Sequence, residues 1–183
     1  EWLFKCGEVP VQQIVPLIPW LMDTYDGDSF YLIGDDYSWP HRINELVTSE
    51  VESNGGEILD EQYTQLGTTD FSSIVPRIAQ EDPDFLFMTL TGASSTSMVS
   101  EIYERGHKDA WTTIGLAHNE DYMTGMSPEE TTGVLSSHAY FRNLDNDANR
   151  EMVERIQNMD EPYVNYLTGT ANAAARFLTS TLS

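Results

Sequence analysis

The chain has 183 residues, of which 40% are hydrophobic and 11% aromatic, so it can bury a core and does not have the composition of a disordered segment. It carries 30 acidic residues against 9 basic ones, a formal net charge of −21, which argues against nucleic-acid binding because phosphate contacts require a basic surface. The acids are scattered and lysine is nearly absent, which favours adaptation to high salt, where repulsion among acids is screened.

Cys6 is the single cysteine, so the sequence has neither an internal disulfide framework nor a cysteine-based zinc site. No apolar run approaches the ~20 residues of a membrane helix, and no signal peptide is present. Glu1 is not a start methionine, and the last residues stop inside a helical pattern without a glycine cap. We therefore expect a piece of a longer protein, for which a missing signal peptide says nothing about export.

The apolar pattern alternates between strand and helix along the chain. Strands are expected over residues 30–34, 57–66, 84–90, 111–117 and 132–140, and helices over residues 11–25, 40–53, 70–80, 94–105, 120–126 (one turn), 147–158 and 166–182. Pro16 and Pro19 weaken the first half of the first helix, and Thr69 or Asp70 is the expected cap of the third. This alternation predicts an α/β fold: a three-layer, Rossmann-like, open parallel sheet with helices on both faces.

Ligands of open parallel sheets bind beyond the carboxyl ends of the strands, so the residues that follow each strand are the site candidates. An acid pair at a strand end can bind Mg²⁺, but the third strand ends in Thr89-Leu90-Thr91 without a third acid, and no lysine follows a late strand. The sequence also lacks a glycine-rich dinucleotide motif, a P-loop and a nucleophile elbow. No metal, cofactor or catalytic constellation is therefore predicted.

The four histidines have no metal-ligand spacing, which makes surface or loop positions the better interpretation. His118 is the exception, because it directly follows a strand and so belongs among the site candidates.

The remaining interpretation is one wall of a small-molecule cleft. Its candidate residues are Asp36, Tyr37, Trp39, Thr89, Thr91, Gly92 and His118. Two rings, two hydroxyls, an accessible glycine amide and a helix N-terminus suit a small neutral or zwitterionic ligand. Purely structural roles stay open: the rings could pack the loop, and the threonines could simply end a strand.

The segment also contains two neighbouring acids, Asp35 and Asp36, for which the sequence suggests different roles. Asp36 could receive an amide N–H₂ group or brace the loop, and the sequence favours neither. Asp35 is expected to be a helix-capping or loop acid rather than a ligand contact.

Three segments resemble the second lobe of type I periplasmic binding proteins: "GDDYSWP" from Gly34 to Pro40, "GTTDFS" from Gly67 to Ser72, and "MTLTG" from Met88 to Gly92. They are most similar to the urea and short-chain-amide branch, alongside the branched-chain amino acid receptors of ABC transporters. The resemblance covers nearly the whole chain. Trp39 stands where that branch has Phe or Tyr, and this larger ring argues against urea itself.

The resemblance implies a two-lobed protein that closes on its ligand about a hinge. Residues 1–10 would form the first crossing between lobes, residues 11–160 the substrate-binding lobe, and residues 161–183 a second crossing followed by a helix that returns to a lobe outside this sequence. Tyr37 and Trp39 would then face the ligand, with Thr89, Thr91 and the loop after Ala117 beside them.

The function that the resemblance implies is the substrate-binding component of an ABC importer for an amide, urea or an amino acid. Such a receptor is expected at the extracellular or periplasmic face, lipid-anchored, and in contact with the permease subunits. The alternative is a cytoplasmic amide-sensing regulator of the same fold. An α/β enzyme is disfavoured because no nucleophile–base pair is apparent in the sequence.

Overall fold

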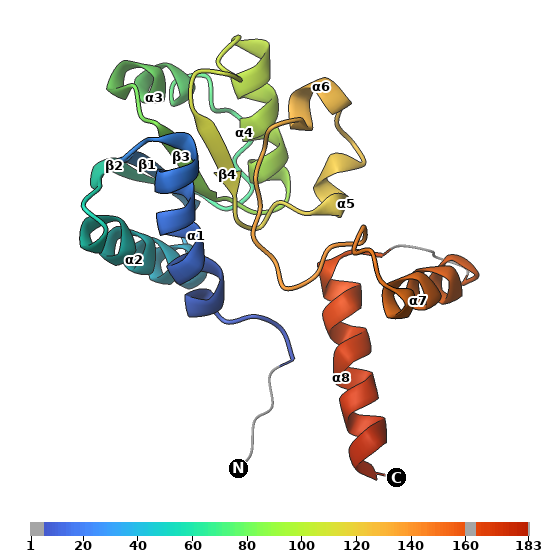
Figure 1. Ribbon diagram of the computed structural model, residues 1–183. Helices are drawn as coiled ribbons and strands as arrows, with labels where there is room; N and C mark the ends of the chain where they lie inside the picture. The colour runs from blue at the N-terminus through green and yellow to red at the C-terminus, as the bar shows by residue number, and fades with distance from the viewer. Residues whose placement is uncertain (1–5, 160–163, 183) are drawn as a thin grey trace. The chain divides into compact units, whose positions relative to one another are not determined.

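The computed structural model describes residues 6–159 and 164–182 (Figure 1). Among these residues, β1 (Ser29–Asp35), β2 (Glu57–Thr64), β3 (Phe85–Thr89) and β4 (Thr112–Gly115) form one sheet. Its strand order is β2-β1-β3-β4, and all neighbouring pairs are parallel. The predicted parallel α/β sheet is therefore confirmed.

Helices connect these strands and continue beyond them. They are α1 (Pro10–Tyr25), α2 (Ser38–Ser53), α3 (Val75–Glu81), α4 (Ala93–Glu104), α5 (Glu120–Met123), α6 (Pro128–Thr131), α7 (Asp147–Gln157) and α8 (Tyr166–Leu182). Figure 1 shows α1 and α2 on one side of the sheet and α3 and α4 on the other. This arrangement gives the three layers that the alternating pattern predicts.

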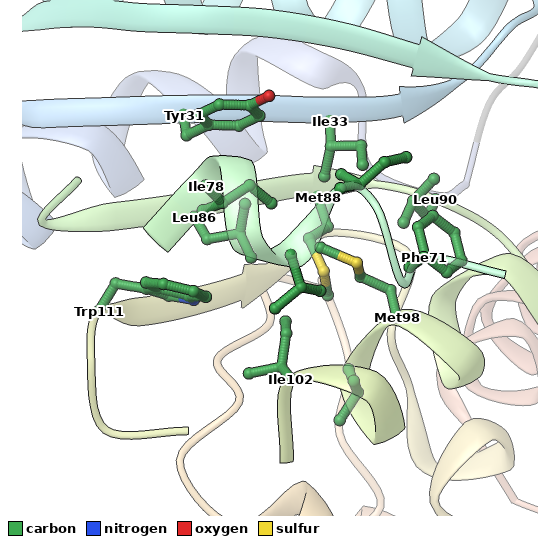
Figure 2. Close-up of a cluster of buried hydrophobic side chains, with 13 residues drawn as sticks. Tyr31, Ile33, Phe71, Ile78, Leu86, Met88, Leu90, Met98, Ile102 and Trp111 are labelled. Carbon is green, nitrogen blue, oxygen red and sulfur yellow. The ribbon is translucent and has the colours of Figure 1, made fainter. Parts of the chain in front are cut away.

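Alternate residues of β1 supply two separate apolar clusters. Tyr31 and Ile33 belong to the cluster on the side of α3 and α4, which Figure 2 shows in close-up. Phe30 and Leu32 belong to the cluster on the side of α1 and α2. All four side chains are fully buried, because successive side chains of a strand point to opposite faces and both faces are covered.

The first helix is continuous in spite of its two interior prolines, Pro16 and Pro19. α1 runs from Pro10 to Tyr25 and buries Ile14, Ile18 and Leu21, which lie on one face at helical spacing. Burial of that face outweighs the backbone hydrogen bonds lost at the prolines, so the first half is helical, where the sequence pattern alone left it in doubt.

Two expected elements are wrong in detail. Residues 132–140 form no named strand; only Leu135 bridges Ile114, and the Ser136 hydroxyl then donates to the His118 carbonyl, 2.6 Å away, in a loop contact. The third helix begins at Val75, five residues later than predicted. Asp70 does not cap it but accepts the backbone N–H of Ser72 at 3.0 Å. The Ser72 hydroxyl and this N–H together lower the pKa of Asp70.

The chain divides into two compact units, one of residues 10–137 and one that joins the residues before 10 to those from 138 onward. The predicted lobe of residues 11–160 therefore extends beyond the larger unit into α7. The predicted crossings fall partly on residues 1–5 and 160–163, which lie outside the described residues.

The second unit has its own small core of Met152, Ile156 and Val164. Within it, α8 exposes Leu167 and Leu178, at 54% and 56% of their surface. Of the helices in the described ranges, none combines the length and the hydrophobicity that a membrane span requires.

The beginnings of β1 and β3 are joined by Asp84. Its carboxylate accepts hydrogen bonds of 2.7–3.0 Å from the backbone N–H groups of Asp28 and Ser29 and from the Ser29 hydroxyl. Burial raises the pKa of Asp84, but these hydrogen bonds outweigh burial and hold the pKa below its usual value.

We expect Asp84→Asn to lower the free energy of unfolding by about 1 kcal/mol at pH 7, because it weakens charge-assisted hydrogen bonds. The folded-state pKa lies below the unfolded one, so this stabilisation is present above the unfolded value of about 4 and is lost as the pH falls through the folded value. Denaturant titrations at pH 7 and below pH 4 measure both effects. Asp109→Asn, which removes a charge from the same groove, is the control; equal loss in both variants at pH 7 contradicts the prediction.

Candidate functional site

The strands end together at what we call the carboxyl edge, formed by the last residues of β1, β3 and β4 and the loops that follow them. Gly34 of β1 is in register with Thr89 of β3, and Met88 is in register with Gly115 of β4. Because the strands are parallel and in register, the residues that follow them gather at one edge.

Asp35 has a different place from the one expected. It is the last residue of β1 and is fully buried, and Tyr37 rather than Asp35 is the N-cap residue of α2. The Asp35 Oδ2 atom accepts two hydrogen bonds of 2.7 Å from Thr91, one from the backbone N–H and one from the hydroxyl. The expected capping or loop role is therefore wrong: Asp35 joins the end of β1 to the loop after β3.

Tyr37 and Trp39 form a stacked ring pair at the start of α2. Their ring centroids are 6.3 Å apart and their planes are inclined by 24°. Both residues are half-buried, and Trp39 also packs against the apolar cluster on the side of α1 and α2. Burial raises the pKa of the Tyr37 hydroxyl, and a hydrogen bond with Thr91 offsets part of that rise. The pair thus keeps part of its surface accessible, while the packing of Trp39 on the apolar cluster fixes its orientation.

Asp36 lies on the surface and pairs with His41, with 2.9 Å between Asp36 Oδ1 and His41 Nε2. The His41 ring in turn stacks on Tyr63, with centroids 3.8 Å apart. The contact braces the loop against α2, which is one of the two roles left open by the sequence.

Thr89 is fully buried behind the surface of the edge. Its hydroxyl is 3.1 Å from Asn44 Oδ1 on α2 and 3.4 Å from the carbonyl oxygen of Ile33. In this conformation the side chain links β3 to α2 and β1 rather than facing solvent.

Thr91 and Gly92 form the turn between β3 and α4. Thr91 is half-buried and Gly92 is exposed, with φ of 53° and ψ of −128°, a conformation that favours glycine. The Gly92 N–H donates to the Tyr122 hydroxyl at 2.9 Å. The turn is therefore held from two sides, by Asp35 through Thr91 and by Tyr122 through Gly92.

His118 is fully buried, unlike the surface or loop histidines that the sequence favours elsewhere. Its Nδ1 atom is 3.2 Å from the Ser95 Oγ atom, and its ring meets Tyr122 edge to face at 5.5 Å. Ser95 is also fully buried, so this pair presents no nucleophile to solvent. Within the part of the chain that the structure describes, no three His, Cys, Asp or Glu side chains gather to hold a metal ion.

Sequence reasoning missed three residues of this edge, namely Asn44, Ser95 and Tyr122. Tyr122 lies in the short helix α5, and His118 precedes the N-cap of that helix, so helical spacing gave no signal for their contact. Asn44 and Ser95 gave no local signal, since their contacts depend on how α2 and α4 pack against the sheet.

Comparison with known families matches residues 1–183 to the family model described as periplasmic binding protein. A solute-binding protein of an ABC transporter from R. palustris, solved with 4-hydroxybenzoate, is 19% identical with a TM-score of 0.81, over 94% of this chain and 48% of that one. The leucine-, isoleucine-, valine-, threonine- and alanine-binding protein from Brucella ovis is 16% identical with a TM-score of 0.80, over 92% and 43%.

An amino acid ABC transporter substrate-binding protein from Pseudomonas fluorescens Pf-5 is 21% identical with a TM-score of 0.74, over 87% of this chain and 42% of that one. The chain thus spans less than half the length of each of these three proteins. At these identities the likeness shows the fold.

Proposed function

Because this chain belongs to the periplasmic binding protein family, we propose that it is one lobe of the substrate-binding component of an ABC importer. The observation that carries the proposal is the half-buried ring pair of Tyr37 and Trp39, which lies at the carboxyl edge of the sheet. Flat ring faces with a few fixed polar groups are what a small polar solute requires. A second lobe would supply the opposite wall.

The seven residues expected from the sequence remain our proposed site, with roles that follow from their burial. Tyr37 and Trp39 offer the stacking surface, and Thr91, Gly92 and Asp36 offer polar groups at or near the surface. Thr89 and His118 are fully buried and would act indirectly. Thr89 holds α2 through Asn44, and His118 holds α4 through Ser95.

The same surface supports a small planar or zwitterionic solute. A stacked ring pair accepts planar groups such as an amide, a urea or a benzene ring, and the fixed polar groups suit an amino acid equally well. Relatives of similar fold include a 4-hydroxybenzoate complex and amino acid receptors. Urea, acetamide, L-leucine and 4-hydroxybenzoate therefore form a discriminating panel.

Isothermal titration of the complete protein with this panel tests the function. We expect at least one of the four solutes to bind with a one-to-one stoichiometry, and the isolated 183-residue chain to bind that solute far more weakly, because half of the contacts would be missing. Absence of binding by the complete protein to all four would count against the receptor, while equal binding by the isolated chain would remove the need for a second lobe.

The second unit fits a role in joining two lobes. The exposed apolar residues Leu167 and Leu178 lie on one face of α8, which we propose packs against the other lobe as the return helix. Export, a lipid anchor and contact with permease subunits complete the importer proposal. A cytoplasmic amide sensor of the same fold would bind solute without them, so the location of the complete protein in cell fractions separates the two.

The acidic composition supports adaptation to high salt. Asp35 is the single acidic side chain that is buried among the described residues, so the repulsion acts between surface carboxylates that salt can screen. We expect the thermal unfolding midpoint to rise steadily from dilute buffer to molar KCl. Sucrose at matched osmolality is the control, since it leaves the charges unscreened. A protein that unfolds no more easily in dilute buffer than in molar KCl would contradict this adaptation.

A further inference from the structure

Asp35 stands apart from the other acids of the chain. Its exposed fraction is 0%, and its Oδ2 atom accepts hydrogen bonds from Thr91 alone. Its Oδ1 atom is buried and has no hydrogen-bond partner among the described residues. A buried carboxylate with one oxygen unsatisfied opposes folding, because desolvation of the charge is only partly offset. Its presence calls for a role other than stability.

The two hydrogen bonds of Asp35 act on the turn formed by Thr91 and Gly92. Thr91 is fixed through both its N–H and its hydroxyl, so its backbone and its side chain are both oriented. The Thr91 carbonyl oxygen accepts the N–H of Ser94 at 3.2 Å, and the Asp35 carbonyl oxygen accepts the N–H of Tyr37 at 2.9 Å. Asp35 is thus connected to the glycine turn through its carboxylate and to the loop that carries the ring pair through its backbone.

We infer that Asp35 is the positioning residue of this edge: its buried carboxylate sets the Thr91–Gly92 turn, and with it the groups that meet the solute, without touching the solute itself. The inference rests on the proposed solute-binding function. It also goes beyond it, because it assigns the geometry of the exposed residues to a buried one that lies outside the proposed contact surface.

If Asp35 positions the turn, its removal lowers the affinity for the solute without lowering the stability of the protein. Asp35→Val removes the acceptor and also removes the cost of the buried charge, while the half-buried Thr91 can turn to water. We expect the thermal midpoint of this variant to stay the same or rise, and its affinity for the solute to fall by about tenfold or more. A merely structural role would lower both quantities together.

Asp35→Asn is the conservative rescue, because an amide oxygen accepts the same two hydrogen bonds without the charge. We expect its affinity to stay within about threefold of the wild type. Thr91→Val and Thr91→Ser form a matched pair at the other end of the contact: the valine removes the hydroxyl and weakens binding, and the serine restores it. Because Thr91 also belongs to the proposed contact surface, the deciding readout of this pair is the hydrogen exchange of the Gly92 amide, which we expect to be faster in the valine variant and near the wild-type rate in the serine variant. This readout keeps the test decisive if Asp35→Val does not fold.

The experiment measures binding of the panel of urea, acetamide, L-leucine and 4-hydroxybenzoate to the complete protein, together with hydrogen exchange of the Thr91 and Gly92 amides. In Asp35→Val we expect these two amides to exchange about tenfold faster or more than in the wild type, and in Asp35→Asn at nearly the wild-type rate.

Two outcomes would overturn the inference. Wild-type affinity with protected turn amides in Asp35→Val would show that the turn needs no carboxylate. An equal loss of affinity in Asp35→Asn and Asp35→Val would assign a direct contact to the charge. If the wild type binds none of the four solutes, the proposed function fails, and the amide exchange alone still decides whether Asp35 holds the turn.

Discussion

Replacing Gly34 by valine is expected to lower the free energy of unfolding by about 3 kcal/mol or more, because no side chain fits at the end of β1. A Cβ atom at this position would lie 2.5 Å from the Thr89 hydroxyl oxygen and 2.9 Å from the Pro40 Cβ atom. Neither neighbour can yield easily: Thr89 is bonded to Asn44, and Pro40 is a rigid ring inside the first turn of α2.

Chemical denaturation of the complete protein measures this effect, with Gly125→Val as the matched control. A Cβ atom on Gly125 meets no heavy atom within 4 Å, so the control adds the same side chain in open space. We also expect Gly34→Val to weaken solute binding, since any outward shift of β1 or α2 displaces the loop between them. Similar unfolding free energies for the two variants would mean that the edge is more loosely packed than the distances imply.

Replacing Trp39 by alanine is expected to weaken solute binding by roughly 1–3 kcal/mol, about 5- to 150-fold in the dissociation constant. The ring is stacked on Tyr37 and half-buried, so it loses little freedom when a solute covers the part that stays exposed. The ring also packs against the apolar cluster beside α1 and α2, so part of the loss will appear as reduced stability.

Two further variants separate these contributions by calorimetric titration and thermal unfolding. Trp39→Phe keeps an aromatic face and should recover most of the affinity. Trp20→Ala removes an exposed ring of α1, which stacks edge to face on Tyr25 at 6.0 Å and lies outside the proposed site. Unchanged affinity in Trp39→Ala would restrict Trp39 to packing, the structural alternative that the sequence also allowed.

The periodic signals of the sequence predicted most of the fold. Continuous apolar runs identified β1 and β3 because strands buried on both faces need apolar residues at every position. The pattern over residues 132–140 has the composition of a strand, yet only Leu135 reaches the sheet. The outer edge of β4 is available, and Leu135 pairs with it through hydrogen bonds with Thr113 and Gly115, but the chain then leaves the sheet toward His118. Strand formation depends on this tertiary path as well as on local composition.

The site was less predictable than the fold, and Asp35 shows why. An acid after a strand and before a helix has the local pattern of a cap, and nothing local indicates a partner 56 residues later in the chain. Thr91 was identified only as a strand-end hydroxyl for the same reason. Long-range polar contacts follow from tertiary packing, so position relative to the strand ends could be predicted and pairing could not.

The contacts around α2 have a consequence for the entropy of binding. Trp39 and Asn44 lie on the same helix, the Asn44 side chain is hydrogen-bonded to Thr89 of β3, and Pro40 packs against Gly34. The ring is therefore part of a rigid body that includes β1 and β3. The ring loses its conformational entropy when the chain folds. The entropy cost of binding therefore comes mainly from the lost motion of the solute and from closure of the lobes.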